Sequence, residues 1–275
     1  MNPALQALGD SFPRKRAFIT GAGSGLGLAL ARALAAERWS LGLFDMNAQK
    51  LTAVEGELAR DGLQIQAYPG DVTQHHELTV AVNSFSQTVE GLDLMINNAG
   101  VVCGGNILEV SPEDWRWIID TNLMGVVHGC RAAIPHLQLS GKSLLLNIAS
   151  AAAFASAPGM APYNVSKAGV LSLSETLAME LADSGIRVAV ALPGFFQTPL
   201  MDSYRGTSDG LETGRMMIEN SNISAATMAN EILREAGRGH TYIVLPKRYR
   251  SLWRLKRWMP LRYLKTFPEL RKKGL

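Results

Sequence analysis

Seven short apolar segments alternate with longer segments of helical periodicity along the first 246 residues, and this alternation limits the folds open to the chain. The short segments have the composition of buried strands and cover residues 16–20, 40–44, 64–68, 92–96, 143–148, 186–192 and 241–245. The intervening helical segments cover residues 26–36, 48–61, 73–89, 112–137, 162–183 and 225–236. Strands joined through helices in this way form a parallel sheet covered on both faces. We therefore expect an α/β fold with a doubly wound, seven-stranded parallel sheet.

One domain accounts for most of the chain. With 275 residues and 47% hydrophobic composition, the protein can bury a large core, and no linker interrupts residues 14–246. We expect residues 1–13 to form an N-terminal arm. Residues 195–223 lack a clear period but contain several phenylalanine and methionine residues, which favours a lid over the substrate site.

The last part of the chain, residues 247–275, differs in charge from the rest. It holds eleven Lys or Arg residues against the single acid Glu269, a formal charge of +10, whereas the remaining residues carry 16 basic and 23 acidic side chains, or −7. Cations and aromatic residues are interleaved there, and Leu252, Leu255 and Met259 form an apolar stripe at helical spacing. We expect this basic tail to be dispensable for chemistry.

Three roles for the tail stay open. It can attach the protein peripherally to a membrane, pack on a partner subunit, or bind nucleic acid. Nucleic acid is not expected as a partner, because no nucleic-acid-binding module accompanies the basic residues.

Neither export nor metal binding is indicated. The first residues show no signal-peptide pattern, and no apolar run reaches the roughly 18 residues of a membrane span. Cys103 and Cys130 have no metal-ligand spacing, and five scattered histidines give no zinc signature. We expect a cytoplasmic protein with reduced thiols and no metal, with peripheral membrane contact at most.

A glycine-rich turn lies between the first strand and the helix after it. Such a turn lets the backbone approach a pyrophosphate at the positive end of the helix, so the pattern predicts a Rossmann-type dinucleotide site. The candidate cofactor-binding residues of this turn are Gly21, Ser24, Gly25, Leu26 and Gly27.

Asp45 ends the second strand, at the distance along the chain where an acid accepts hydrogen bonds from the adenosine ribose. A carboxylate there repels the 2′-phosphate of NADP, and neither Ser24 nor Met46 supplies a compensating cation. We therefore expect NAD rather than NADP. The alternative is that Asp45 only caps the following helix.

From residue 14 to about residue 246 the chain resembles the short-chain dehydrogenase/reductase family. The resemblance rests on motifs in family order: the glycine turn, Asp71-Val72, Asn97-Asn98-Ala99-Gly100, Asn122, Ser150, Tyr163 with Lys167, and Pro193-Gly194 followed by Thr198. It implies that Asp71 and Val72 border the adenine. It also implies that Asn98, Ala99 and Gly100 line the cofactor channel, and that Pro193, Gly194 and Thr198 meet the nicotinamide.

Tyr163 and Lys167 are four residues apart on one predicted helix and therefore share a face. A lysine ammonium close to a phenol favours the phenolate, so Tyr163 is the expected acid/base for hydride chemistry. The family resemblance adds that Lys167 binds the nicotinamide ribose and that Ser150 bonds the substrate oxygen. By the same resemblance, Asn122 holds a water that relays protons.

The sequence thus predicts an NAD-dependent oxidoreductase that acts on a hydrophobic secondary alcohol or its ketone. The competing interpretation is a non-catalytic dinucleotide-binding protein whose tail binds a membrane or partner. We expect a homodimer or homotetramer formed through the helices that carry Asn122 and Tyr163.

Overall fold

The structure is a computed structural model that describes residues 5–272, with side chains up to residue 266. Seven parallel strands form one sheet in the order β3-β2-β1-β4-β6-β7-β9. Their bounds are β1 Arg16–Thr20, β2 Ser40–Asp45, β3 Ile65–Pro69, β4 Leu94–Asn97, β6 Ser143–Ile148, β7 Ile186–Pro193 and β9 Tyr242–Leu245. The predicted doubly wound sheet is confirmed.

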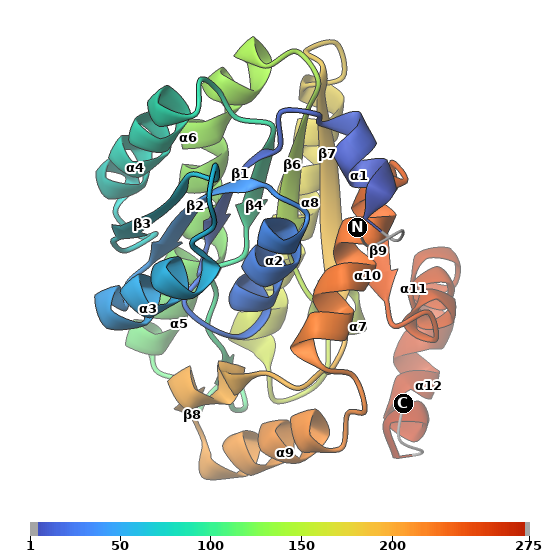
Figure 1. The fold of residues 1–275 in the computed structure, drawn as a ribbon. Coiled ribbons are helices and arrows are strands. Elements are labelled where there is room, and N and C mark those ends of the chain that lie inside the picture. The colour runs from blue at the N-terminus through green and yellow to red at the C-terminus, as the bar shows by residue number, and fades with distance from the viewer. Residues whose placement is uncertain (1–4, 273–275) are drawn as a thin grey trace.

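Helices cover both faces of the sheet (Figure 1). One face packs against α2 (Gly25–Ala36), α3 (Ala48–Leu58) and α10 (Ala225–Gly237), and the other against α4 (His75–Thr88), α6 (Gly125–Leu139) and α8 (Ala161–Glu180). The strands are apolar on both sides because each face is buried beneath a helical layer. This arrangement brings the carboxyl ends of the strands to one edge, where the candidate residues gather.

The long helix expected over residues 112–137 is not regular. It consists of α5 (Pro112–Ile119), a π-helical turn η1 (Asp120–Met124) and α6. The π turn inserts extra backbone into the helix, and it contains Asn122, whose side chain bonds the backbone of Val101. The interruption therefore coincides with a candidate site residue.

The N-terminal segment belongs to the domain core, which corrects the expectation of a separate arm. Helix α1 (Gln6–Ser11) packs on α10, and the side chains of Leu5, Leu8 and Phe12 are buried. A Cβ on Gly237 of α10 would lie 2.8 Å from the Leu8 backbone nitrogen, so glycine at that position permits the close approach of the two helices.

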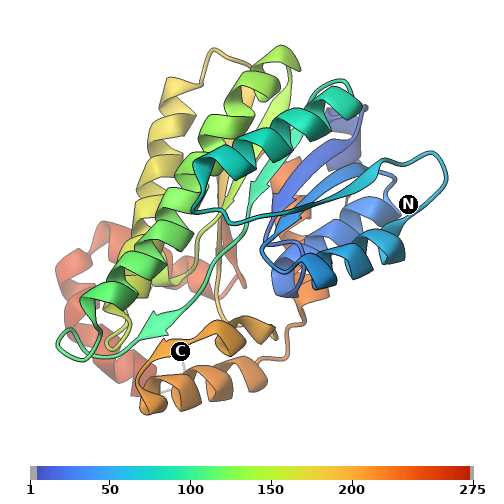
Figure 2. The ribbon, with the colours of Figure 1, turned by 90° about the vertical axis from the view of Figure 1, so that its left-hand side faces the viewer.

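Residues 195–223, which we predicted to form a lid, have more regular structure than their sequence indicates. It contains a 3-10 turn η2 (Pro199–Ser203), the short strand β8 (Arg205–Gly206) and the helix α9 (Ser208–Glu219). Strand β8 pairs with β5 (Cys103–Gly104), outside the main sheet. Figure 2 shows α9 beyond the carboxyl end of the sheet. None of the residues of α9 is fully buried.

The basic tail folds into two helices, α11 (Tyr249–Trp258) and α12 (Pro260–Lys272), beside the edge strand β9 (Figure 1). Arg250 ties the tail to the domain: its Nε donates to the Val244 carbonyl of β9 at 3.2 Å, and its guanidinium pairs with Glu235 at 3.0 Å. Burial raises the pKa of Glu235, but bonds to Arg250, Arg234 and His240 outweigh it and hold the pKa below its usual value. Within residues 5–272, no helix is long and apolar enough to cross a bilayer.

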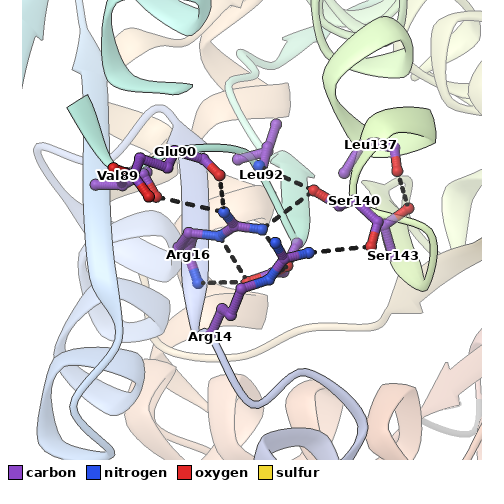
Figure 3. A network of polar contacts seen from close by, with 9 residues as sticks. Arg14, Arg16, Val89, Glu90, Leu92, Leu137, Ser140 and Ser143 are labelled. Atoms are coloured by element: carbon purple, nitrogen blue, oxygen red, sulfur yellow. Dashed lines mark hydrogen bonds and ion pairs between the residues drawn. The ribbon is translucent and has the colours of Figure 1, made fainter. Parts of the chain in front are cut away.

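A buried ion pair fastens the opposite, amino-terminal edge of the sheet (Figure 3). The guanidinium of Arg16 on β1 bonds both carboxylate oxygens of Asp93, just before β4, at 2.8 and 3.0 Å. Arg16 also donates to the Ser140 hydroxyl at 3.1 Å and to the carbonyls of Val89 and Glu90. The two central strands are thereby joined at the edge that lies away from the candidate site.

Candidate active site

The turn between β1 and α2 has the geometry of a phosphate-binding loop. Gly21 and Gly25 have φ values of +66° and +54°, which favour glycine. A Cβ on Gly27 would lie 2.0 Å from the Gly21 carbonyl oxygen, so only glycine lets the helix approach the turn this closely. Ser24 precedes α2 without capping it through its side chain. The first N–H groups of the helix are thus directed at a space that suits a pyrophosphate.

Asp45 closes the other side of this turn. Its two carboxylate oxygens accept hydrogen bonds from the backbone N–H groups of Gly23 and Asn47, each at 2.9 Å. The helix cap is Asn47, whose side chain accepts from the Lys50 N–H, so capping α3 does not account for the acid. Asp45 places a negative charge beside the dinucleotide turn.

The neighbouring strand ends brace the same edge. Asn98 donates through Nδ2 to the carbonyls of Thr20 and Gly21 at 2.9 and 3.2 Å, and the Ala99 N–H donates to the Thr20 hydroxyl at 3.1 Å. Both residues therefore hold the β4 end against the glycine turn. Asp71 follows β3 and accepts from the Thr73 N–H through its side chain.

Val72 is buried beneath the site and packs on Gly125 of α6, where a Cβ would lie 2.8 Å from a methyl group of Val72. Its carbonyl bonds the His128 ring at 2.9 Å. His128 thus helps to position the segment after β3. Cys130 on the same helix is buried, and burial raises the pKa of its thiol to about 12.

Ser150, Tyr163 and Lys167 lie together near the carboxyl ends of the strands. Ser150 follows β6, and the other two lie on α8 with side chains that are 8% and 4% exposed. The Lys167 ammonium lies 5.9 Å from the centre of the Tyr163 ring and donates to the Ile148 carbonyl at 3.1 Å. The predicted shared face of the helix is observed.

Burial, and not Lys167, sets the direction of the tyrosine pKa. Burial raises the pKa of Tyr163 above that of a free phenol, and a hydrogen bond with Ser150 offsets part of this rise. Burial also lowers the pKa of Lys167 to about 8. In the protein alone, desolvation therefore favours the protonated phenol. That Lys167 and the positive charge of the oxidised nicotinamide together favour the phenolate stays a prediction.

Asn122 is fully buried, and its side chain is committed to the protein. Its Oδ1 accepts from the Val101 N–H at 2.8 Å, and its Nδ2 donates to the Val101 carbonyl at 2.9 Å and to the Ser166 hydroxyl at 3.1 Å. Ser166 thereby joins α8 to Asn122. A Cβ on Gly100 would lie 3.2 Å from Asn122 Oδ1 and 3.3 Å from Lys167 Nζ, so both polar groups lie close to this glycine.

The segment after β7 links the two halves of the site. The Pro193 carbonyl accepts from the Ala151 N–H at 2.8 Å, which joins this segment to the residue after Ser150. Thr198 reaches the glycine turn: its Oγ1 lies 2.9 Å from the position of a Cβ on Gly25. Pro193, Gly194 and Thr198 thus border the space between the turn and Ser150.

An apolar cluster surrounds Tyr163 on the side away from the glycine turn. Its buried members are Val102, Cys103, Val110, Ile118, Tyr163 and Met201. The lid contributes Leu200, Tyr204, Leu211 and Ile218 as partly buried neighbours. Of the residues singled out in the lid by sequence, Met201 joins the cluster, Phe196 packs in the core under the sheet, and Met216 is 52% exposed.

Two tyrosines of the tail support the site, and sequence analysis did not identify either. The Tyr249 ring packs on Gly194, where a Cβ would lie 2.8 Å from it. Tyr263 is completely buried, and its hydroxyl donates to the Ala155 carbonyl at 2.7 Å, at the end of the short helix α7 (Ala152–Ala155) that follows Ser150. The only sequence feature that could have indicated this role is the presence of two tyrosines in a segment rich in Lys and Arg, and we interpreted that segment by its charge. The tail therefore contacts segments next to the site, and its being dispensable for chemistry stays a prediction.

Among residues 5–272, no group of three metal-ligating side chains is gathered in one place. The site is instead built from hydrogen-bonding groups and glycine contacts. A doubly wound sheet, a glycine turn shaped for a dinucleotide and a buried tyrosine–lysine pair at the same edge define a dinucleotide-dependent oxidoreductase.

Comparison with known proteins identifies the family. The sequence profile of the short chain dehydrogenases matches residues 15–209, and the chain belongs to the short-chain dehydrogenase/reductase family of NAD(P)-dependent oxidoreductases. An uncharacterized oxidoreductase of Staphylococcus aureus (strain MRSA252) is 32% identical over 78% of this chain and 89% of its own length. The 2-(R)-hydroxypropyl-CoM dehydrogenase of Xanthobacter autotrophicus is 30% identical over 82% of this chain and 93% of its own.

A solved structure agrees with both the fold and the cofactor class. The short chain dehydrogenase/reductase from Burkholderia phymatum in complex with NAD has a TM-score of 0.82 and 28% identity, over 88% of this chain and 92% of that one. The family resemblance inferred from the motifs is confirmed.

Proposed function

We propose that the protein is an NAD-dependent dehydrogenase or reductase for a hydrophobic secondary alcohol or its ketone. The observation that carries this proposal is the position of Tyr163, which belongs both to the buried pair with Lys167 and to the apolar cluster under the lid. A substrate oxygen bonded to the phenol would therefore have its carbon substituents among apolar side chains. The Xanthobacter relative is a 2-(R)-hydroxypropyl-CoM dehydrogenase, which supports an alcohol or ketone substrate in general terms.

The residues of the chain supply the proton transfer. When bound, the nicotinamide accepts or donates the hydride. Tyr163 exchanges a proton with the substrate oxygen, and Ser150 donates a hydrogen bond to the same oxygen, which stabilises negative charge that develops there. Because burial keeps the phenol protonated, it is already in the form needed to protonate a ketone. In the alcohol-oxidising direction, positive charge on the oxidised nicotinamide ring adds to that of Lys167 and favours the phenolate.

Lys167 connects this reaction to solvent. Its ammonium has a lowered pKa of about 8, which lets it exchange protons near neutral pH. We propose that a water bound by Lys167 Nζ and Asn122 Oδ1, which both lie close to Gly100, receives the proton. Asn122 would then act through one remaining lone pair of Oδ1, since both of its N–H groups are already bonded.

Asp45 is the residue that we propose sets the choice of NAD over NADP. Its carboxylate lies at the glycine turn, and the adjacent Met46 is 77% exposed and uncharged. The ribose hydroxyls of NAD would donate to the carboxylate, whereas a 2′-phosphate would be repelled by it.

The test is a screen of secondary alcohols with NAD and of ketones with NADH, in which turnover is measured as the change in NADH absorbance. Tyr163→Phe should retain NADH binding and lose turnover by about 10²-fold or more. The matched control is Tyr68→Phe, because the Tyr68 hydroxyl bonds Gln66 on its own strand. Wild-type protein that binds NADH but turns over no member of the panel would favour the non-catalytic alternative. Turnover by Tyr163→Phe close to wild type would remove Tyr163 from the mechanism.

We further propose that the protein forms homodimers through the helices that carry Asn122 and Tyr163. Met124 on η1 and Val165 on α8 are apolar but 38% and 50% exposed on adjacent elements. Val165→Glu should yield monomers in sedimentation velocity. An unchanged sedimentation coefficient would exclude this interface.

A further inference from the structure

The tail presents a group of large apolar side chains to solvent. Trp258 is 82% exposed, Leu261 76%, Leu264 58% and Met259 43%. These four residues, which we term the tail face, lie within seven consecutive positions at the junction of α11 and α12. Single exposed apolar residues are common on protein surfaces, but a contiguous set this large marks a site of contact.

The opposite side of the same two helices is held by the domain. In the sequence Tyr263 lies between Leu261 and Leu264, yet its side chain is completely buried. The Lys256 ammonium lies over the Tyr263 ring, 4.8 Å from its centre. Leu252 and Trp253 pack on the core beside β9. Because Tyr263 fixes the rotation of α12, Leu261 and Leu264 cannot turn inward without losing its bond to Ala155.

This arrangement corrects the apolar stripe predicted from sequence. Leu252, a member of that stripe, packs against the domain, whereas Met259 is exposed. The surface open to a partner is therefore displaced from the predicted stripe towards Trp258, Leu261 and Leu264.

Cations surround the tail face. Arg254, Arg262 and Lys265 are exposed, and no ion pair joins them to an acid among the described residues. Arg257 and Arg250, by contrast, pair with Glu175 and Glu235 and serve to attach the tail. No acidic residue occurs between Lys247 and Pro268, and the acids that pair with the tail bond Arg250 and Arg257, so positive charge remains beside the tail face.

We propose that the tail face docks on the surface of an anionic lipid bilayer. Tryptophan and leucine side chains suit the boundary between headgroups and acyl chains, and the flanking arginines and lysines suit anionic headgroups. A nucleic acid would attract the cations but would leave Leu261 and Leu264 in water. A second copy that docked through its own tail face would bring the same positive charge to the interface and be repelled. The proposal concerns attachment and does not rest on the proposed reaction.

The proposal can be tested by co-sedimentation of the full chain with vesicles. Wild-type protein should bind vesicles of phosphatidylcholine mixed with phosphatidylglycerol, and bind vesicles of phosphatidylcholine alone much more weakly. Salt should weaken the binding, because charges in water are screened over about 10 Å at 0.1 M. Arg262→Gln with Lys265→Gln should weaken the partition roughly 25-fold, at about fivefold for each cation near the surface.

The apolar contribution is tested separately. Leu261→Ala with Leu264→Ala should weaken the partition by about tenfold or more, since apolar area that enters the interface is lost. Two controls should bind as wild type. Leu139→Ala removes a leucine on α6 that is more exposed than either tail-face leucine, and Lys50→Gln with Lys142→Gln removes two exposed cations elsewhere. Every variant keeps Tyr263, so NADH binding and circular dichroism should match wild type and show that the fold is retained.

Three outcomes would overturn the proposal. The first is no binding of wild-type protein to either vesicle, and the second is equal loss of binding in the controls and the tail-face variants. The third is a change of oligomeric state in Leu261→Ala with Leu264→Ala without an effect on vesicle binding, which would mean that a second copy covers the tail face. Because vesicle binding requires no turnover, these outcomes are independent of whether the proposed reaction is correct.

Discussion

Replacing Tyr263 by Phe tests whether the basic tail is part of the catalytic domain. The substitution keeps the buried ring and removes only the hydroxyl that bonds the Ala155 carbonyl at 2.7 Å. A carbonyl that is left without its donor and shielded from water costs about 1–3 kcal/mol, and the Ala155 carbonyl is half-buried. Because Tyr263 is completely buried, we place the loss near the middle of this range, at about 2 kcal/mol.

This loss should appear as local opening of the tail before it appears in global unfolding. A change of about 2 kcal/mol raises the open population of α12 roughly 30-fold. The tail contains several lysine and arginine residues, so trypsin cleavage in this region reports on opening. The initial cleavage rate of Tyr263→Phe should therefore exceed that of wild type by about 30-fold, under conditions in which opening is fast compared with cleavage.

Opening should also reach the active site, through α7. The Ala152 N–H donates to the Ser150 hydroxyl at 3.1 Å, so the position of Ser150 depends on the helix that Tyr263 holds at its other end. We expect the turnover number to fall by severalfold, with NADH affinity nearly unchanged. Trp258→Phe is the control, because Trp258 lies on the same tail but is 82% exposed. Tail cleavage and turnover of Tyr263→Phe equal to those of Trp258→Phe would refute the argument.

Three further predictions follow from other parts of the structure. Lys167 has a pKa of about 8 in the fold against 10.5 when exposed, so the unfolded chain binds more protons than the folded chain between these pH values. As pH rises from 8 to 10.5, the unfolding free energy of wild type, measured by urea titration, should therefore increase by about 3 kcal/mol relative to that of Lys167→Met. Parallel pH profiles of the two proteins would contradict the assignment of Lys167 as a buried lysine. Asp45→Ser with Met46→Arg should move the ratio of kcat/KM values from NAD towards NADP, and a wild-type preference for NADP would show that Asp45 does not set it. Arg16→Met leaves the buried Asp93 carboxylate without its main partner and should lower the unfolding free energy by about 3–5 kcal/mol. The double variant Arg16→Met with Asp93→Leu should recover much of this loss, because no unpaired charge stays buried. If the single and the double variant were equally stable, an unpaired Asp93 carboxylate would not be the cause of the destabilisation.

The sequence was sufficient for the features that depend on neighbouring residues. Strand and helix periods repeat over a few residues, so the alternation of segments predicted a doubly wound sheet. The glycines between Thr20 and Leu26 are required by local backbone geometry, and a spacing of four residues is enough to place Tyr163 and Lys167 on one helix face. The family motifs could be recognised for the same reason, since each is short and ordered along the chain.

The tertiary structure decided the features that depend on residues distant in sequence. Tyr263 and Ala155 are 108 positions apart, and no periodicity of the tail reveals that they meet. The same holds for the π turn, which accompanies bonds from Asn122 to Val101 and Ser166, 21 and 44 positions away. The direction of the Tyr163 pKa likewise follows from burial by α5, α8 and the lid together. Desolvation depends on everything that surrounds a group, so it is determined only when the chain has folded.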